Sequence, residues 1–178
     1  QMSAAFIEGL ASQGVSSCIV AFPGYGAVSG DEKEGMTTTA RTREEMESAE
    51  FIAYKAAVNA GAEFLQIGTI SAPGLTGDNT QCCLSGEAVR VVREDLGFEG
   101  VIVTGALNTA ATTLYYDPAD AAVRALKAGC DMIYLPEKFE EAYNGVLEAV
   151  QNGVLTQERI DESLIRIYRV KYKDRVAQ

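Results

Sequence analysis

Four short apolar runs, each preceded by a stretch of helical periodicity that ends near a glycine, constrain the fold of this chain more than any other feature. Short runs rich in β-branched and bulky residues are typical of strands that are buried on both faces of a parallel sheet. Glycine after a helical stretch supplies the left-handed conformation at which helices commonly end. The sequence therefore predicts an α/β fold in which helix and strand alternate four times. The expected strands are residues 17–22, 63–68, 100–104 and 131–135, and the helices before them are 4–13, 43–60, 85–96 and 118–128.

The regular alternation also predicts the architecture. Two more amphipathic helices are expected over 137–151 and 156–170, separated by Asn152 and Gly153. A repeat without a change of pattern favours a (β/α) TIM-barrel-type fold over a doubly wound sheet with a switch point. Four β/α units are half of an eight-stranded barrel, which usually takes about 250 residues. We therefore expect residues 1–178 to form a single domain, a half-barrel with C-terminal helices.

A half-barrel leaves the edges of its sheet without partners, and three explanations stay open. The first half of the barrel is missing from the chain, another copy pairs with it as a homo-oligomer, or the strand edges remain exposed.

Composition excludes several classes of partner. The formal net charge is −10, whereas surfaces that bind nucleic acids or anionic membranes need clustered Lys and Arg. No run approaches the roughly 20 apolar residues that a membrane span needs. The chain as given also shows no basic segment followed by an apolar stretch at its start, so no targeting signal is expected in it.

The absence of histidine limits the possible chemistry. The chain contains no histidine, which removes Ser-His-Asp triads, Cys-His dyads and histidine-based zinc sites together. The cysteines lack C-x-x-C spacing and are interpreted mainly as core residues, although the adjacent pair Cys82 and Cys83 is able to oxidise if it lies in a loop. The acidic residues of the helix at 43–60 have no second converging group, so no metal and no cofactor are predicted.

Two stretches without regular pattern, 24–42 and 71–81, directly follow predicted strands. In a barrel these loops lie at the carboxyl ends of the strands, where function normally resides. The charged residues 31–34 can be interpreted as an acid/base cluster, but a solvated loop is the simpler interpretation. Asp78 can be interpreted as a catalytic nucleophile, but the sequence Gly77-Asp78-Asn79 is more typical of a turn.

Four segments, in the right order and spacing, give the chain a resemblance that covers essentially its whole length. The segments resemble the barrel domain of glycoside hydrolase family 3, in the β-N-acetylhexosaminidase branch, and correspond to the C-terminal half of that barrel. They are Phe22-Pro23-Gly24-Tyr25-Gly26 with Asp31, residues 64–70 with Pro73, residues 93–104, and residues 128–136 followed by 158–164.

The resemblance implies retaining glycoside hydrolysis, in which one carboxylate attacks the anomeric carbon and a second group protonates the departing oxygen. In the family branch the nucleophile is an Asp and the proton donor is a His, and these positions match Gly105 and Lys33. A glycine cannot form a glycosyl-enzyme ester, and an exposed lysine is a poor proton donor to a glycosidic oxygen at neutral pH. Asp31 matches the retained member of the family's Asp-His pair. Tyr25 and Thr69 stand where the family has further histidines.

The scaffold residues match while the polar site residues do not, which leaves three functional hypotheses. The first is an inactive family 3-like domain with a glycan-binding or structural role, for which Tyr25, Thr69 and Asp31 are the expected substrate-binding residues. The second is an active retaining β-N-acetylglucosaminidase whose missing groups come from an absent N-terminal half or another chain. The third is a half-barrel homodimer with a scaffold role. The resemblance implies a carbohydrate partner, a GlcNAc-containing glycan, and a secreted or cell-envelope location rather than a cytoplasmic one.

Overall fold

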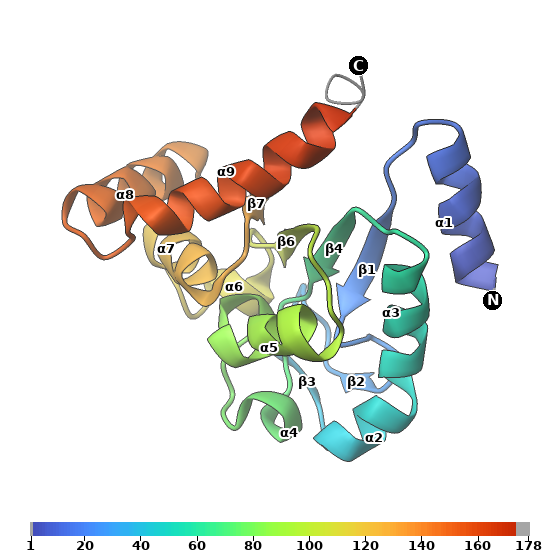
Figure 1. Ribbon diagram of the computed structural model, residues 1–178. Helices are drawn as coiled ribbons and strands as arrows, with labels where there is room; N and C mark the ends of the chain where they lie inside the picture. The colour runs from blue at the N-terminus through green and yellow to red at the C-terminus, as the bar shows by residue number, and fades with distance from the viewer. Residues whose placement is uncertain (1, 174–178) are drawn as a thin grey trace.

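The central feature of the fold is a sheet of four parallel strands in the order β1-β4-β6-β7 (Figure 1). The structure is a computed structural model that describes residues 2–173. Each strand pairs with the next along the sheet, without reversal of direction. This order has no switch point, so the prediction of a half-barrel is confirmed. The strands are β1 (Cys18–Phe22), β4 (Phe64–Ile67), β6 (Val101–Ala106) and β7 (Met132–Tyr134).

Helices precede and follow the strands as the sequence predicts. α1 lies beside α3 beyond β1, and α8 lies beyond α7 at the other end of the sheet (Figure 1). The apolar core between strands and helices includes Phe22, Leu65, Ile102 and Phe98, all of which are buried. The principal helices are α1 (Met2–Ser12), α3 (Glu50–Asn59), α5 (Gly86–Arg90), α7 (Pro118–Ala128), α8 (Phe139–Gln151) and α9 (Gln157–Lys171).

Two predicted helices differ from the expectation. The stretch 43–60 divides into α2 (Arg43–Ser48) and α3, because Ala49 adopts φ −127° and ψ −79°, which are not helical angles. The stretch 85–96 begins as α5 and ends in a π-helical segment, η2 (Val91–Asp95). Neither break carries a proline or a glycine that would have marked it in the sequence.

The two long loops contain more regular structure than the sequence predicts. A small second sheet with strand order β2-β3-β5 lies at the carboxyl ends of the main strands. It consists of β2 (Val28–Ser29), β3 (Thr37–Thr39) and β5 (Ile70–Ser71). Three short helical segments accompany it, α4 (Pro73–Thr76), η1 (Cys82–Leu84) and α6 (Ala110–Thr113).

The four glycines expected at helix ends all adopt left-handed backbone angles. Gly14, Gly61, Gly97 and Gly129 have φ between 68° and 115°. Gly129 also packs closely, since a Cβ atom placed on it would lie 2.8 Å from Cγ1 of Val89. At this position the sequence therefore needs glycine for both the backbone angle and the packing.

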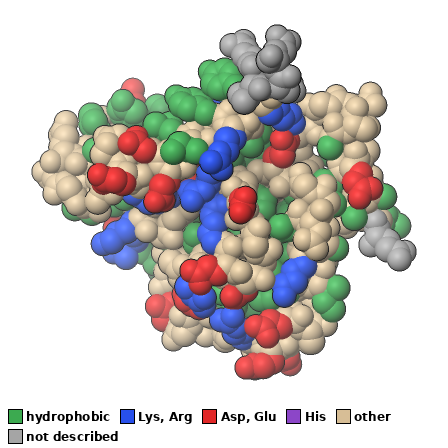
Figure 2. All heavy atoms as spheres, in the orientation of Figure 1, with side chains coloured by type: hydrophobic (Ala, Val, Ile, Leu, Met, Phe, Trp, Pro, Cys, Tyr) green, Lys and Arg blue, Asp and Glu red, His purple; other side chains and the backbone are tan. Residues whose placement is uncertain are grey.

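Helix α9 crosses the amino ends of the strands and is fastened there by Asp131. The Asp131 carboxylate is buried and lies 2.6 Å from Nη2 of Arg93 and 3.0 Å from Nη1 of Arg166. It also accepts hydrogen bonds from the Ser163 hydroxyl at 2.7 Å and the Ile102 backbone N–H at 2.9 Å. One carboxylate thus joins β6, β7, η2 and α9. Figure 2 shows Lys and Arg side chains in a band that starts at α9 and continues below it.

Candidate functional site

Three of the residues singled out in the sequence meet at the carboxyl ends of the main strands. Tyr25 lies in the turn after β1, Thr69 lies between β4 and β5, and Gly105 lies near the end of β6. The Gly68 backbone N–H donates to the Phe22 carbonyl at 2.8 Å, which holds the ends of β1 and β4 together. Parallel strands bring their carboxyl ends to one edge of the sheet, and this is why residues far apart in sequence converge there.

A carboxylate that sequence reasoning did not single out, Glu32, lies at the centre of this site. The Tyr25 hydroxyl donates to Oε2 of Glu32 at 3.1 Å, and the Thr69 hydroxyl donates to the same oxygen at 3.3 Å. Burial, followed by the negative charge of Glu32, raises the pKa of Tyr25 to about 12. Glu32 therefore connects the turn after β1 with the segment after β4.

The neighbours of Glu32 face different surroundings. Asp31 accepts the Lys33 backbone N–H at 2.9 Å, which is the hydrogen bond of an Asx turn. Asp31 and Lys33 are both exposed. The Glu32 carbonyl accepts the Ala111 N–H at 2.9 Å and so fixes the loop to α6. Of the charged loop residues, only Glu32 has its carboxylate bonded to Tyr25 and Thr69. The spacing gives no signal of which side chain turns inward.

Gly105 is buried in close contact with the segment after β4. A Cβ atom at Gly105 would lie 3.1 Å from the backbone nitrogen of Thr69 and 3.3 Å from its Cγ2 atom. Both distances are tighter than ordinary van der Waals contact, so a side chain at this position requires Thr69 to move.

Buried polar groups lie next to the site. The Thr112 hydroxyl donates to Oε1 of the fully buried Gln81 at 3.1 Å, and Nε2 of Gln81 donates to the Ala111 carbonyl. Cys82 and Cys83 are buried in η1 as free thiols rather than lying in an exposed loop. Asp78 accepts the Thr80 backbone N–H at 2.8 Å and acts as a turn residue.

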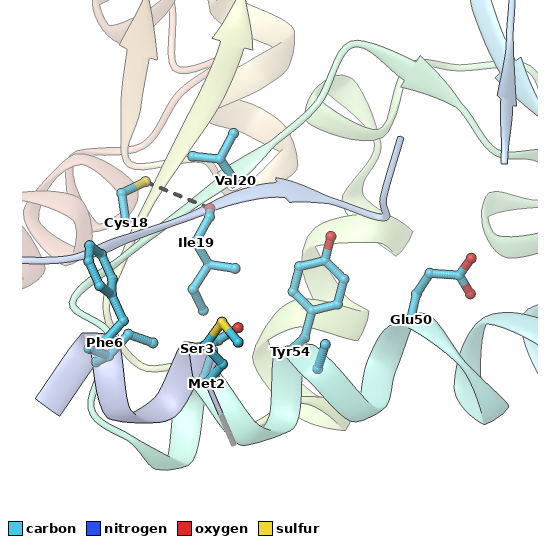
Figure 3. A pocket seen from close by; sticks show the side chains of 11 residues that line it. Met2, Ser3, Phe6, Cys18, Ile19, Val20, Glu50 and Tyr54 are labelled. Atoms are coloured by element: carbon cyan, nitrogen blue, oxygen red, sulfur yellow. Dashed lines mark hydrogen bonds between the residues drawn. The ribbon is translucent and has the colours of Figure 1, made fainter. Parts of the chain in front are cut away.

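Two hollows border the sheet. The first, which we call the loop pocket, has a volume of about 300 Å³ and is lined by Tyr25, Val28, Gly30, Asp31, Glu32 and Thr37. The second, which we call the edge groove, has a volume of about 550 Å³ and lies between α1, α3 and the open edge of β1. Figure 3 shows Phe6 of α1, Val20 of β1 and Tyr54 of α3 around the edge groove.

Residues 2–173 contain no group of three or more His, Cys, Asp or Glu side chains arranged to hold a metal ion. Within the same range, no helix combines the length and the apolar character that a membrane crossing requires.

Comparison with known proteins identifies close likenesses in sequence and structure. The chain is 27% identical, over 96% of its length, to a β-N-acetylglucosaminidase/β-glucosidase of Cellulomonas fimi, and it spans 32% of that protein. It is 29% identical to the β-hexosaminidase LpqI of Mycobacterium bovis and spans 45% of it. A family 3 β-N-acetylglucosaminidase from Paenibacillus superposes with a TM-score of 0.92 at 27% identity, over 98% of this chain and 34% of that one. This chain thus spans a third to under a half of the length of these relatives.

The family follows from a match over nearly the whole chain. Residues 1–170 match the family model described as the glycosyl hydrolase family 3 N terminal domain. The four parallel strands, the order of the helices and the superposition agree with that match. The chain belongs to the glycosyl hydrolase family 3 N-terminal domain family.

Proposed function

We propose that this chain is a catalytically inactive family 3 domain that binds a GlcNAc-containing glycan without hydrolysing it. The observation that carries the proposal is Gly105, which stands at the position of the nucleophile and has no group that can form a glycosyl ester. A side chain at this position would also require the Thr69 segment to give by a few tenths of an ångström. The β-N-acetylglucosaminidase and β-hexosaminidase names of the relatives support the choice of glycan.

The remaining carboxylates do not supply a replacement pair. A retaining glycosidase needs two carboxyl groups about 5–5.5 Å apart, one on each side of the reacting bond. Glu32 is hydrogen-bonded to Tyr25 and Thr69, whereas Asp31 is engaged by its own loop backbone. Lys33, at the position of the proton donor, is exposed on the loop. The site retains hydroxyls and one inward carboxylate, which are groups that bind sugar hydroxyls.

Two measurements on the purified chain test this proposal. No hydrolysis of an aryl β-N-acetylglucosaminide above a buffer blank is expected, and chitobiose is expected to shift the NMR signals of Tyr25 and Thr69. Hydrolysis that persists through purification and is abolished by Glu32→Gln, but not by the matched loop variant Glu34→Gln, would refute inactivity. The absence of any chitobiose-dependent shift would refute glycan binding.

A second proposal, on assembly, rests on the open edges of the sheet. Neither β1 nor β7 has a partner on its outer side within residues 2–173. Apolar side chains are exposed at both edges, including Val20 on β1 and Tyr134 on β7. Unpaired edges with apolar flanks are sites of strand addition. We infer that a further set of parallel strands completes the barrel.

The positions of α1 and α8 favour a complementary half over a second copy. α1 packs against α3 beyond β1, and α8 packs against α7 beyond β7, so a helix already lies outside each open edge (Figure 1). In a closed homodimer, α8 of one copy and α1 of the other would compete for the same pair of strands. A different four-stranded unit that begins and ends with a strand, and so brings no helix of its own to the two junctions, avoids this competition between helices. Such a unit would add binding groups to the site, but it would not place a nucleophile at Gly105.

Light scattering on the isolated chain distinguishes the two assemblies. A monomer at micromolar concentration is expected. A stable dimer would overturn the choice of a complementary half. A matched double variant, Val20→Lys with Tyr134→Lys, reports whether any association uses these edges.

A further inference from the structure

We propose that Tyr134, at the carboxyl end of β7, is the aromatic platform on which a sugar ring of the bound glycan stacks. This inference rests on the proposed glycan-binding function and adds a contact on the side of the site opposite Tyr25. Three observations carry it: the direction of the Tyr134 side chain, its place in a row of groups across the sheet, and the way its backbone is held.

The Tyr134 side chain points to the face of the sheet that the helices leave open. Alternate residues of a strand point to opposite faces. Ile133 packs against the buried clusters on the helical side, whereas Met132 and Tyr134, on either side of it, are exposed. In β1, likewise, Ile19 packs against the core and Val20 is exposed. In a (β/α) barrel the face away from the helices is the interior, and ligands bind where that interior opens at the carboxyl ends of the strands.

Tyr134 lies at one end of a row of groups that crosses the carboxyl ends of the strands. Its register partner on β6 is Ala106. Gly105, next to Ala106, adjoins the end of β4, since a Cβ atom placed on it would lie 3.1 Å from the Thr69 nitrogen. The Thr69 hydroxyl in turn binds the same carboxylate as the Tyr25 hydroxyl, which lies after β1. The row therefore runs from hydroxyls beside β1 and β4, over two small residues on β6, to the aromatic ring on β7.

The two ends of this row are far enough apart to hold a sugar between them. Neighbouring strands lie about 4.8 Å apart, so β4 and β7, which are separated by β6, lie roughly 10 Å apart. Neither Gly105 nor Ala106 carries a side chain large enough to fill the space over β6. A ligand lying there is able to contact Thr69 on one side and Tyr134 on the other. Pairing of a further strand with the outer edge of β7 would use backbone N–H and C=O groups and leave this face free.

The backbone of Tyr134 is fixed from both sides. Its N–H donates to Oγ1 of Thr104 at 2.9 Å, and its carbonyl accepts the N–H of Leu107 at 3.1 Å. The next residue, Leu135, has φ 45°, and within residues 2–173 no other non-glycine residue has a positive φ. Residues other than glycine are rarely held in this region, and those that are cluster at ligand sites. A ring whose backbone is held in this way loses little freedom when a ligand binds.

A tyrosine ring supplies the kind of contact that the rest of the site lacks. A pyranose carries hydroxyls around its edge and C–H groups on its faces. The face of an aromatic ring is electron-rich and attracts positively polarised hydrogens such as these C–H groups. Glu32, Tyr25 and Thr69 offer polar partners to the sugar hydroxyls. Ligand sites usually combine an aromatic or apolar lining with a few polar groups, and Tyr134 provides the aromatic part.

The test is an NMR titration of chitobiose into the parent chain and three variants. Tyr134→Phe keeps the ring and is expected to bind like the parent. Tyr134→Leu keeps apolar bulk without the ring and is expected to bind roughly tenfold more weakly, the size of one aromatic contact. The control Tyr143→Leu makes the same change at an exposed tyrosine of α8, outside the site, and is expected to leave binding unchanged. Stacking also predicts an upfield ring-current shift of the sugar C–H protons in the parent and in Tyr134→Phe, and its loss in Tyr134→Leu.

The outcomes separate this inference from the function on which it rests. Binding of chitobiose by Tyr134→Leu as tight as that of the parent overturns the stacking role and leaves glycan binding intact. Equal losses in Tyr134→Phe and Tyr134→Leu also overturn it, because the hydroxyl and not the ring face would then make the contact. A matching loss in Tyr143→Leu overturns the assignment to Tyr134. No binding by the parent chain overturns glycan binding, and the stacking role with it.

Discussion

The phenolic oxygen of Tyr25 lies 3.1 Å from Oε2 of Glu32, the same carboxylate oxygen that the Thr69 hydroxyl reaches at 3.3 Å. Two hydroxyls from different segments thus converge on one carboxylate at the carboxyl ends of β1 and β4. By the family resemblance, these two hydroxyls stand at positions that the family fills with histidine, and their arrangement has measurable consequences.

Replacing Glu32 is expected to lower the pKa of Tyr25. Burial and, to a smaller extent, the Glu32 charge together raise that pKa to about 12. In Glu32→Gln the charge is gone while the burial remains, so the pKa falls part of the way toward the usual value of about 10. Tyrosinate absorbance during alkaline titration measures the change. The difference between each protein and its Tyr25→Phe counterpart isolates Tyr25 from the other tyrosines, and an unchanged midpoint would contradict the expectation.

The same shift predicts a loss of stability at alkaline pH. Tyr25 has a pKa of about 12 in the folded state and about 10 in the unfolded state, so the folded state holds the proton more tightly. This contribution to the free energy of unfolding is fully present below about pH 10. Between these two values the unfolded state has lost the proton that the folded state keeps, so the free energy of unfolding decreases as pH rises. Urea denaturation across this range measures the slope, which should be shallower in Tyr25→Phe. Parallel slopes in the two proteins would contradict the linkage.

Removing the charge of Asp131 is expected to destabilise the fold strongly. Asp131→Asn keeps the shape of the side chain but leaves Arg93 and Arg166 near each other without their common carboxylate. Removing one partner of a buried ion pair typically lowers the free energy of unfolding by about 3–5 kcal/mol. This is a large part of the stability of an ordinary domain. Urea denaturation gives the change in the free energy of unfolding. The exposed control Glu99→Gln should stay within about 0.5 kcal/mol of the parent, and a similar small effect for Asp131→Asn would refute the role assigned to it.

Two glycine substitutions separate backbone strain from packing. Gly129 and Gly153 both have left-handed backbone angles, but only at Gly129 would a Cβ atom meet another residue, Cγ1 of Val89, at 2.8 Å. Gly153→Ala is therefore expected to cost about 1–2 kcal/mol for the backbone alone. Gly129→Ala should add about 1–3 kcal/mol of overpacking. Thermal or urea unfolding of the two variants side by side tests this, and equal costs would show that the contact with Val89 is relieved freely.

The four cysteines are expected to differ sharply in reactivity. Cys18 is exposed at the edge groove, whereas Cys82, Cys83 and Cys130 are buried. Burial raises the pKa of Cys82 and of Cys130 to about 12, which leaves little thiolate at neutral pH. A colorimetric thiol reagent should therefore modify one cysteine in the native chain and four after denaturation. Cys18→Ser should abolish the native reaction, and more than one rapid modification in the parent would contradict the buried placement.

The main sheet and its helices were predictable because their signal is long and repeated. Apolar runs marked the strands to within two residues of their ends, and glycine marked the helix ends at Gly14, Gly61, Gly97 and Gly129. The break at Ala49 had no such marker, since alanine is a strong helix former and tertiary contacts decide its conformation. Strands as short as Val28–Ser29 fall below the length at which alternation is detectable.

The site was predictable in position but not in composition. Loops after parallel strands indicated where Tyr25, Thr69 and Gly105 would meet. The inward turn of Glu32 depends on the Asx turn at Asp31 and on the backbone bond from Ala111, which is distant in sequence. The family resemblance drew attention instead to Asp31 and Lys33, and both of these residues are exposed.

The close approach of Thr69 to Gly105 sets how much room a side chain at this position would have. A Cβ atom there would lie 3.1 Å from the Thr69 nitrogen, so the neighbouring segment would have to give by a few tenths of an ångström to admit one. Any side chain introduced at Gly105, a carboxylate included, is therefore coupled to the position of the segment that follows β4.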